Sequence, residues 1–215
     1  MAPSRAIPPL CAITDVALAG GLSHAAIARE LVAGGASWIQ VRDKNAAGGR
    51  LLEALKETIA AVRAAPGGER ILVVVNDRPD LAMASGADGT HLGEEDLPAS
   101  EARRILGPHA LLGVSTHSVE AGLAAASLPV DYVAIGPVFP TKTKRDAAPA
   151  VGLEAVRALA SAIDRPVVGI GGIDARNARE VLDAGAAAVA VISALYDPPS
   201  SIRGNTAGLL AALSG

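Results

Sequence analysis

The sequence has few aromatic residues, a single cysteine and no long apolar run. Phe, Trp and Tyr make up 2% of its 215 residues, so we expect a core of Ala, Val, Leu and Ile. Cys11 alone excludes a disulfide framework or a cysteine-type zinc site within one chain. No uncharged apolar stretch reaches the roughly 18 residues that span a bilayer, so no membrane partner is expected. Residues 1–9 are proline-rich and lack the apolar core of a signal peptide, which predicts a cytoplasmic protein.

Basic residues are also too few for a nucleic-acid-binding surface. The net charge is −3, so nucleic acid is not an expected partner. Only four lysines occur, and Lys44, Lys142 and Lys144 each follow an apolar, strand-like run. Because an ammonium group is a compact point charge for phosphate, these positions indicate a phosphorylated ligand. For Lys142, chance placement on the surface remains the alternative.

Short Val- and Ile-rich runs alternate with longer Ala- and Leu-rich segments of helical period. The predicted strands cover residues 10–14, 38–42, 71–76, 89–92, 111–115, 131–135, 167–170 and 188–192. The predicted helices cover residues 23–34, 48–64, 78–85, 99–106, 118–126, 151–162, 174–184 and 201–213. Eight such units predict a compact parallel (β/α)8 TIM barrel of class α/β, as a single domain over residues 1–215. A doubly wound sheet is the alternative, although no GxGxxG motif follows the first predicted strand.

In such a barrel, functional side chains lie at the C-terminal ends of the strands. Gln40 and Arg42 alternate along the second predicted strand, so both should face the lumen near its mouth, with Lys44 just beyond. A buried arginine beside a lysine requires anions, which a phosphorylated ligand would supply. The alternative is a structural salt bridge from Arg42 to Asp15 or Asp77.

Two carboxylates follow successive strands. Asp77 comes directly after Asn76 at the end of the third predicted strand, and Asp96 lies in the loop after the fourth. Mg²⁺ usually binds through one or two carboxylates together with substrate phosphate oxygens. As the alternative, Asp77 would cap the helix that begins at Arg78, and Asp96 would cap the helix that begins near Ala99. The nearby cations favour the metal site.

The break after the sixth predicted strand, residues 136–150, is the longest between a strand and a helix. Thr141 and Thr143 alternate there with Lys142 and Lys144. Long loops in compact domains are commonly functional, and this composition indicates a loop that grips a phosphate. A solvated surface loop is the alternative.

A glycine pair follows the seventh predicted strand, and a short polar segment follows the eighth. Gly171 and Gly172 let the backbone approach a ligand closely, and Ile192 and Ser193 lie in the neighbouring loop. In barrels these two loops often bind a phosphate through backbone N–H groups. The pair therefore predicts a phosphate without indicating a reaction.

The histidines have no metal-ligand spacing. We expect His24 and His109 on the surface, and His91 and His117 near the mouth in local hydrogen bonds. Glu94 and Glu95 are interpreted as solvated neighbours of Asp77 and Asp96.

Together these segments resemble the thiamine phosphate synthase family over essentially the whole chain. The matching segments are IQVRDK (39–44), VNDRPDLAMASGADGTHLGEEDLP (75–98), GVSTHS (113–118), DYVAIGPVFPTKTK (131–144), VVGIGGI (167–173) and AVISAL (190–195). The block at 75–98 and the GPVFPTKTK loop are specific to the family, whereas the glycine pair is not.

The resemblance implies a transferase with small phosphorylated substrates. It would join 4-amino-2-methyl-5-(diphosphooxymethyl)pyrimidine to thiazole phosphate, giving thiamine phosphate and pyrophosphate by a Mg²⁺-assisted dissociative mechanism. By motif position, the residues for the pyrimidine diphosphate are Gln40, Arg42, Lys44, Asn76, Ser115 and Lys144, with Arg42, Lys44 and Lys144 catalytic. Those for the thiazole phosphate are Thr141, Thr143, Gly172, Ile192 and Ser193. The implied Mg²⁺ ligands are Asp77 and Asp96.

Two rival functions remain on the same barrel. A thiazole tautomerase-type paralogue is expected to carry a histidine where this chain has Pro137, and to lose the diphosphate and metal residues. A non-catalytic thiazole-phosphate-binding barrel would show no turnover. Asp77, Asp96 and Lys44 favour the synthase. Ala187 stands where the family commonly has Asp, for which we expect an effect on packing at the start of the last strand.

Overall fold

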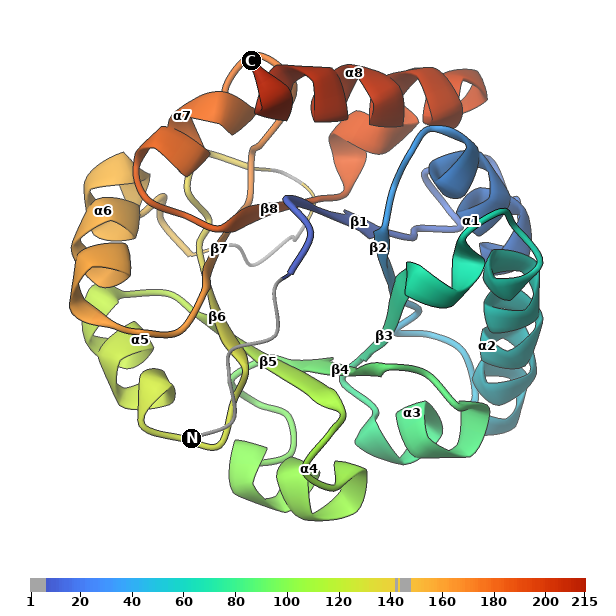
Figure 1. Cartoon of the computed structure of the whole chain (residues 1–215), viewed down its shortest axis with the longest axis horizontal. Coiled ribbons are helices and arrows are strands. Elements are labelled where there is room, and N and C mark those ends of the chain that lie inside the picture. The colour runs from blue at the N-terminus through green and yellow to red at the C-terminus, as the bar shows by residue number, and fades with distance from the viewer. Residues whose placement is uncertain (1–6, 142, 144–147) are drawn as a thin grey trace.

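The fold is a closed barrel of parallel strands surrounded by helices (Figure 1). The computed structural model describes residues 7–141, 143 and 148–215. Within these residues, strands β1 to β8 pair in chain order, and β1 closes the barrel against β8. The predicted (β/α)8 barrel is confirmed. No helix in this part of the chain is long and apolar enough to cross a membrane.

Most elements begin and end within two residues of their predicted bounds. The strands are β1 (Leu10–Ile13), β2 (Trp38–Val41), β3 (Leu72–Asn76), β4 (Gly89–Leu92), β5 (Leu111–Thr116), β6 (Tyr132–Ile135), β7 (Val167–Ile170) and β8 (Ala188–Val191). The helices are α1 (His24–Ala33), α2 (Gly48–Arg63), α3 (Pro79–Ser85), α4 (Ala99–Leu106), α5 (Val119–Ala126), α6 (Gly152–Ala162), α7 (Ala178–Asp183) and α8 (Ile202–Ser214). Three short 3-10 helices, which were not predicted, are η1 (Gly68–Arg70), η2 (Ser193–Tyr196) and η3 (Pro199–Ser201).

Helix α7 begins four residues later than predicted. The Asp174 amide donates to Asn177 Oδ1 at 2.9 Å, and Asp174 Oδ1 accepts from the Arg176 amide at 2.8 Å. Such local side-chain hydrogen bonds compete with the helix for the backbone. Residues 174–177 therefore form a turn, and the helix starts at Ala178.

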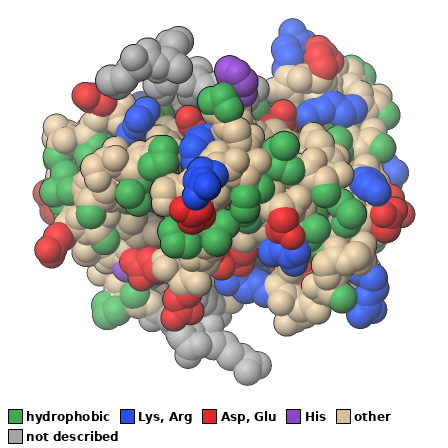
Figure 2. Space-filling model, turned by 90° about the horizontal axis from the view of Figure 1, so that it is seen from below, with side chains coloured by type: hydrophobic (Ala, Val, Ile, Leu, Met, Phe, Trp, Pro, Cys, Tyr) green, Lys and Arg blue, Asp and Glu red, His purple; other side chains and the backbone are tan. Residues whose placement is uncertain are grey.

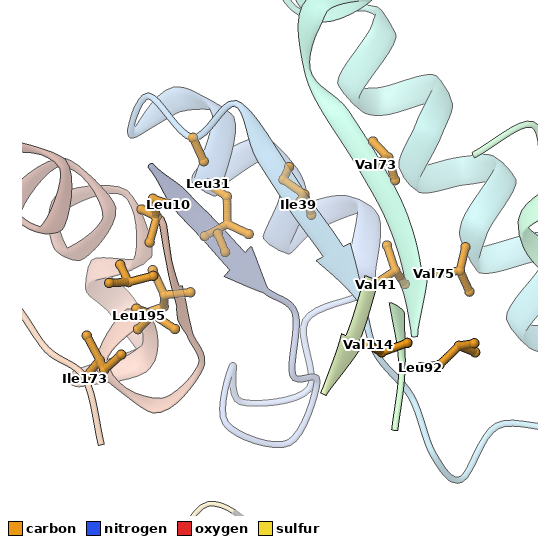
Figure 3. Packing of buried hydrophobic residues seen from close by; sticks show 14 of the residues in the cluster. Leu10, Leu31, Ile39, Val41, Val73, Val75, Leu92, Val114, Ile173 and Leu195 are labelled. Atoms are coloured by element: carbon orange, nitrogen blue, oxygen red, sulfur yellow. The ribbon is translucent and has the colours of Figure 1, made fainter. Parts of the chain in front are cut away.

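Aliphatic side chains fill the layer between the strands and the helices (Figure 3). Ile39, Val73 and Leu92 lie on the outer face of the barrel and are at most 1% exposed. Leu31 of α1 and Leu195 of η2 belong to the same cluster. Because these side chains are short and branched, the helices pack closely onto the strands, as the composition predicted.

A second cluster occupies the barrel lumen, and it includes aromatic residues. Trp38 and Tyr132 meet edge to face, with ring centroids 5.1 Å apart and an interplanar angle of 88°. A core without aromatic residues was therefore the wrong expectation for the lumen. Gly113 makes room for this pair, because a Cβ atom there would lie 1.9 Å from the Tyr132 ring. The position of Tyr132 matters for the site above it.

An arginine ties together the N-terminal ends of β3 and β4. Arg63 donates to the carbonyl oxygens of Gly68 and Ile71 at 2.9 and 2.6 Å, and to Asp88 Oδ2 at 2.8 Å. The same carboxylate oxygen accepts from the Val73 amide at 2.7 Å. One ion pair thus fastens a helix end, a loop and two strands.

Arg103 repeats this arrangement one strand pair further along the barrel. It donates to the carbonyl oxygens of Gly107 and Ala110 at 3.0 and 2.6 Å, and to Asp131 Oδ2 at 2.7 Å. Asp131 Oδ2 also accepts from the Leu112 amide at 2.8 Å. We call these two arrangements the arginine clamps.

The start of β8 has the same backbone contact without a carboxylate. The Ala187 amide donates to the Val167 carbonyl at 2.8 Å, as the Asp88 amide does to the Val73 carbonyl. An aspartate at position 187 would stand where Asp88 and Asp131 form their clamps. Ala187 has no carboxylate with which to form such a clamp, and the expected effect on packing stays a prediction.

Charges of both signs are mixed on the side of the barrel that Figure 2 shows. Elsewhere in the described structure, short-range pairs along helices include Lys56 with Glu53 at 3.1 Å and Arg179 with Asp183 at 2.7 Å. Lysine and arginine do not gather into one basic patch on this face.

Candidate active site

A cavity of about 550 Å³ opens at the C-terminal ends of the strands, opposite the arginine clamps. Every described residue of the predicted site lines it: Gln40, Arg42, Lys44, Asn76, Asp77, Asp96, Ser115, Thr141, Thr143, Gly172, Ile192 and Ser193. The two remaining candidates, Lys142 and Lys144, lie outside the described residues. The closed barrel thus brings together side chains that are up to about 150 residues apart in the sequence.

Asp77 and Asp96 form an acidic pair at one side of the cavity. Burial, together with the neighbouring carboxylate of Asp96, raises the pKa of Asp77 to about 6. Lys44 acts in the opposite direction, with its Nζ 3.3 Å from Asp77 Oδ2. Two carboxylates held this close repel each other unless a proton or a cation lies between them.

Neither carboxylate caps a helix, so the capping alternative is wrong. Helix α3 has Arg78 at its N-cap and α4 has Pro98, and neither end has a side-chain cap hydrogen bond. Asp96 Oδ2 instead accepts from the Gly93 amide at 2.7 Å, within its own loop. The Asp77 carboxylate lies beside Asp96 and Lys44.

Asp77 has an unusual backbone conformation. Its φ is 64°, the only positive φ of a non-glycine residue in the described part of the chain. The conformation is held by a hydrogen bond of 2.8 Å from the Asp77 amide to the His91 carbonyl. Strained residues of this kind cost about 1–3 kcal/mol and cluster at binding sites.

Two cations, Arg42 and Lys44, also line the cavity. Arg42 Nη1 lies 4.0 Å from Asp15 Oδ2, at the outer limit of an ion pair. The predicted alternative, a structural bridge from Arg42 to Asp15, is thus present as a long contact. Arg42 also lines the cavity, and the Lys44 side chain is half exposed at its rim.

Two amide side chains at the cavity make no side-chain hydrogen bond to the described residues. They belong to Gln40 on β2, which is 3% exposed, and to Asn76 at the end of β3. Their amide atoms are not among the fully buried, unpaired atoms of the described residues, so both face the cavity and are open to a ligand. A ligand with donor and acceptor groups, such as an aminopyrimidine, would satisfy both.

His91 connects the cavity to the lumen. Its Nε2 lies 2.8 Å from Ser115 Oγ, and its Nδ1 lies 2.9 Å from the Tyr132 hydroxyl. Burial lowers the pKa of His91 to about 4, so the ring is neutral near pH 7. The predicted local hydrogen bonding of His91 is confirmed, while its link to Tyr132 was not foreseen.

The other histidines divide between the surface and the interior. His109 is exposed as predicted, and His117 Nδ1 bonds to the Gly136 carbonyl at 2.5 Å. The surface prediction for His24 is wrong: it is 4% exposed, and its Nδ1 lies 2.8 Å from Thr14 Oγ1. The loop after β2 covers this ring, a contact that local sequence does not reveal.

The glycine pair lets two neighbouring loops pack on each other. Gly171 and Gly172 have φ values of 96° and 67°. A Cβ atom at Gly172 would lie 2.7 Å from the Pro140 carbonyl oxygen, and one at Gly171 would lie 2.5 Å from the Pro137 side chain. The sequence interpretation considered only a ligand's approach, whereas the packing of the β6–α6 loop requires glycine as well.

Sequence reasoning missed the apolar floor of the cavity, which Ile13, Ile170 and Ala190 line. Glu94 and Glu95 are exposed beside the acidic pair, as expected, and they also line the cavity. The floor residues lie on the lumen face of their strands. Strand alternation could have identified them once the lumen face was known from Gln40.

The fold and the cavity define a (β/α)8-barrel protein whose site combines carboxylates, cations and amides. A family model described as thiamine monophosphate synthase matches residues 10–195. The thiamine-phosphate synthase of Methanoculleus marisnigri is 47% identical over 186 residues, which cover 86% of each chain. That of Chlorobium phaeovibrioides is 43% identical over 93% of this chain and 90% of its own.

A solved structure agrees with these sequence relatives. The thiamine phosphate pyrophosphorylase of Pyrococcus furiosus superposes with a TM-score of 0.85 at 38% identity, covering 96% of this chain and 95% of its own. The chain belongs to the thiamine monophosphate synthase family.

Proposed function

We propose that this protein is a thiamine phosphate synthase that uses Mg²⁺. It joins 4-amino-2-methyl-5-(diphosphooxymethyl)pyrimidine to thiazole phosphate and releases pyrophosphate. One observation carries the proposal: the acidic pair, two cations and two unpaired amides line the same cavity as the β6, β7 and β8 loops. Membership of the family supports this function.

The donor atoms of the acidic pair fit a hard divalent cation. Asp77 and Asp96 offer carboxylate oxygens, and burial together with the neighbouring Asp96 carboxylate raises the pKa of Asp77, an effect that a bound cation would oppose. Mg²⁺ usually takes one or two carboxylates, with substrate phosphate oxygens and water as further ligands. When bound, Mg²⁺ would neutralise charge on the leaving pyrophosphate.

The reaction breaks one bond and forms one. The bond between the pyrimidine methylene carbon and the diphosphate oxygen breaks, and its electron pair leaves with pyrophosphate. The thiazole nitrogen then donates its lone pair to the resulting pyrimidinylmethyl cation. No side chain has to act as a nucleophile, so positioning and charge stabilisation provide the catalysis.

The cations have the role of receiving the leaving group. Arg42 and Lys44 line the cavity, with Lys44 beside Asp77, and both would bind diphosphate oxygens. Lys144 has the same proposed role, although it lies outside the described residues. Gln40, Asn76 and Ser115 would hold the pyrimidine diphosphate on the opposite side of its reacting carbon.

The thiazole phosphate is assigned to the other half of the cavity. The residues proposed to bind it are Thr141, Thr143, Gly172, Ile192 and Ser193. The apolar floor below, with Ile13 and Ile170, would keep water away from the reactive cation. With this division of the cavity, the two substrates would lie side by side at the mouth.

Turnover with both substrates tests the proposal. We expect pyrophosphate and thiamine phosphate to form with Mg²⁺, and to stop when EDTA removes the metal. Asp96→Asn should greatly reduce the rate, whereas Glu95→Gln, a matched change in the same loop, should leave most of it. Equal turnover in EDTA would refute the metal requirement. Binding of thiazole phosphate without any turnover would favour the non-catalytic barrel.

A further inference from the structure

Ser115, His91 and Tyr132 form a hydrogen-bonded row from the cavity into the barrel lumen. Ser115 lines the cavity, while His91 is 7% exposed and Tyr132 is 1% exposed. The two contacts, at 2.8 and 2.9 Å, each join atoms that can donate or accept. The direction of the row therefore depends on which nitrogen of His91 carries the proton.

Burial of the phenol decides this direction. Among the described residues, the Tyr132 hydroxyl has one hydrogen-bond partner, His91 Nδ1. If Nδ1 carried the proton, the phenol would accept there, and its own proton would have no partner in that part of the chain. The unpaired donor would disfavour this form by about 5- to 150-fold in population.

The opposite tautomer gives every polar atom of His91 and the Tyr132 hydroxyl a hydrogen-bond partner. With the proton on Nε2, the Tyr132 hydroxyl donates to Nδ1, and Nε2 donates to Ser115 Oγ. Ser115 then already accepts a hydrogen bond from the protein. Its own proton is left to point toward the cavity.

We propose that Tyr132 and His91 are positioning residues that hold Ser115 Oγ as a hydrogen-bond donor to bound substrate. Given the proposed function, the acceptor is a lone pair of the pyrimidine diphosphate, on a ring nitrogen or a phosphate oxygen. Trp38 packs edge to face on Tyr132, and Gly113 leaves room for its ring, so the phenol is fixed in place.

Nitrogen NMR of the imidazoles tests the direction without requiring turnover. In ¹⁵N-histidine-labelled protein near pH 7, we expect His91 to carry its proton on Nε2, with the signal assigned by its loss in His91→Gln. Ser115→Ala should keep this form, because Tyr132 still donates to Nδ1. Tyr132→Phe should give a mixture of the two His91 tautomers, whereas Tyr196→Phe, a control at another buried tyrosine, should keep the proton on Nε2.

The opposite tautomer in the unaltered protein would overturn the proposal. In that case the Tyr132 hydroxyl would donate its proton to a water in the small lumen cavity, which is lined by Trp38, Gln40 and Tyr132 among others. A change of tautomer in Ser115→Ala would overturn it as well. If Tyr132→Phe does not fold, the unaltered protein and Ser115→Ala still decide the direction.

Kinetics test the consequence for substrate. We expect Ser115→Ala and Tyr132→Phe each to lower kcat/KM for the pyrimidine diphosphate about tenfold, and the double variant to be no worse than Ser115→Ala. The KM for thiazole phosphate should not change. Additive losses, or a raised KM for thiazole phosphate, would refute the positioning role. An unaltered protein without any turnover would refute the proposed function instead, and the NMR result would still stand.

Discussion

Replacing Asp77 by asparagine should make the metal-free protein more stable while removing its activity. The carboxylate of Asp77 is mostly buried and lies beside that of Asp96. Its pKa is about 6 in the folded protein, against 3.8 for an ordinary aspartate. The ionised carboxylate is therefore less stable in the folded protein than in the unfolded chain. Asparagine carries no charge, so it avoids this cost.

The magnitude follows from the difference in pKa. A shift of about two units at about 1.4 kcal/mol each gives roughly 3 kcal/mol at a pH above the folded pKa. The folded state binds more protons than the unfolded state between about pH 4 and 6, so the free energy of unfolding falls as the pH rises through this window. The asparagine side chain does not titrate, so the gain from Asp77→Asn should be about 3 kcal/mol at pH 8 and much smaller at pH 4.

The backbone does not oppose this substitution. Asparagine, like aspartate, tolerates a positive φ such as the 64° observed at Asp77. The figure of about 3 kcal/mol already includes the loss of the 3.3 Å contact with Lys44, because that contact lowers the pKa of Asp77 from which the figure is taken. No new strain is expected.

Urea unfolding in EDTA at several pH values measures the effect. For a chain of this size, about 3 kcal/mol corresponds to a rise in Tm of roughly 6–12 °C. Glu95→Gln is the matched control, since it removes an exposed carboxylate from the same cavity and should give no pH-dependent gain. A gain for Asp77→Asn of equal size at pH 4 and pH 8 would refute the reasoning, as would no gain at pH 8.

Three further substitutions test other parts of the structure. Lys44→Gln should lower kcat/KM for the pyrimidine diphosphate by about 10- to 100-fold, with a smaller effect at high salt, because an exposed cation is screened; steady-state kinetics at two ionic strengths measure this. Asp131→Asn should lower the free energy of unfolding, measured in urea, by about 2 kcal/mol, because it removes the charged oxygen that accepts from both Arg103 and the Leu112 amide. An unchanged free energy of unfolding would contradict the stabilising role of this clamp. Gly113→Ala should destabilise the protein by about 3 kcal/mol or more, because the added methyl group would clash with the Tyr132 ring. A folded variant with an unchanged Tm would show that the lumen side chains can shift without cost and would contradict this expectation.

The barrel could be predicted from the sequence because its repeating unit is local. Apolar runs buried on both faces, separated by helical periods, define eight strand–helix units without knowledge of any distant contact. The apolar pattern alone does not identify which face of a strand forms the lumen. Trp38 lies two residues before Gln40 on β2, so alternation could have assigned it to the lumen, whereas β6 has no polar residue to mark the lumen face for Tyr132.

The polar residues of the site could be predicted because they stand where apolar strands end. Their roles were less evident, since an aspartate before a helix fits both a cap and a metal ligand. The structure excludes the cap for Asp77, because Arg78 is the N-cap residue of α3 and no side chain caps that end; the metal role of Asp77 stays our proposal. His24 was misplaced because its burial depends on the loop after β2, which is brought over it only by the closed barrel.

The two ends of the barrel distribute their polar groups in opposite ways. At the N-terminal ends of the strands, the clamps of Arg63 and Arg103 satisfy carboxylates, carbonyls and amides within the protein. At the mouth, Gln40 lacks a described side-chain partner, and Asp77 combines a positive φ with a carboxylate that resists ionisation. The proposed cation would relieve the cost at Asp77, and the proposed substrate would bond to the open amide of Gln40. Polar groups satisfied within the protein at one end would thus maintain the fold, while groups left open at the other end would contribute to the free energy of binding.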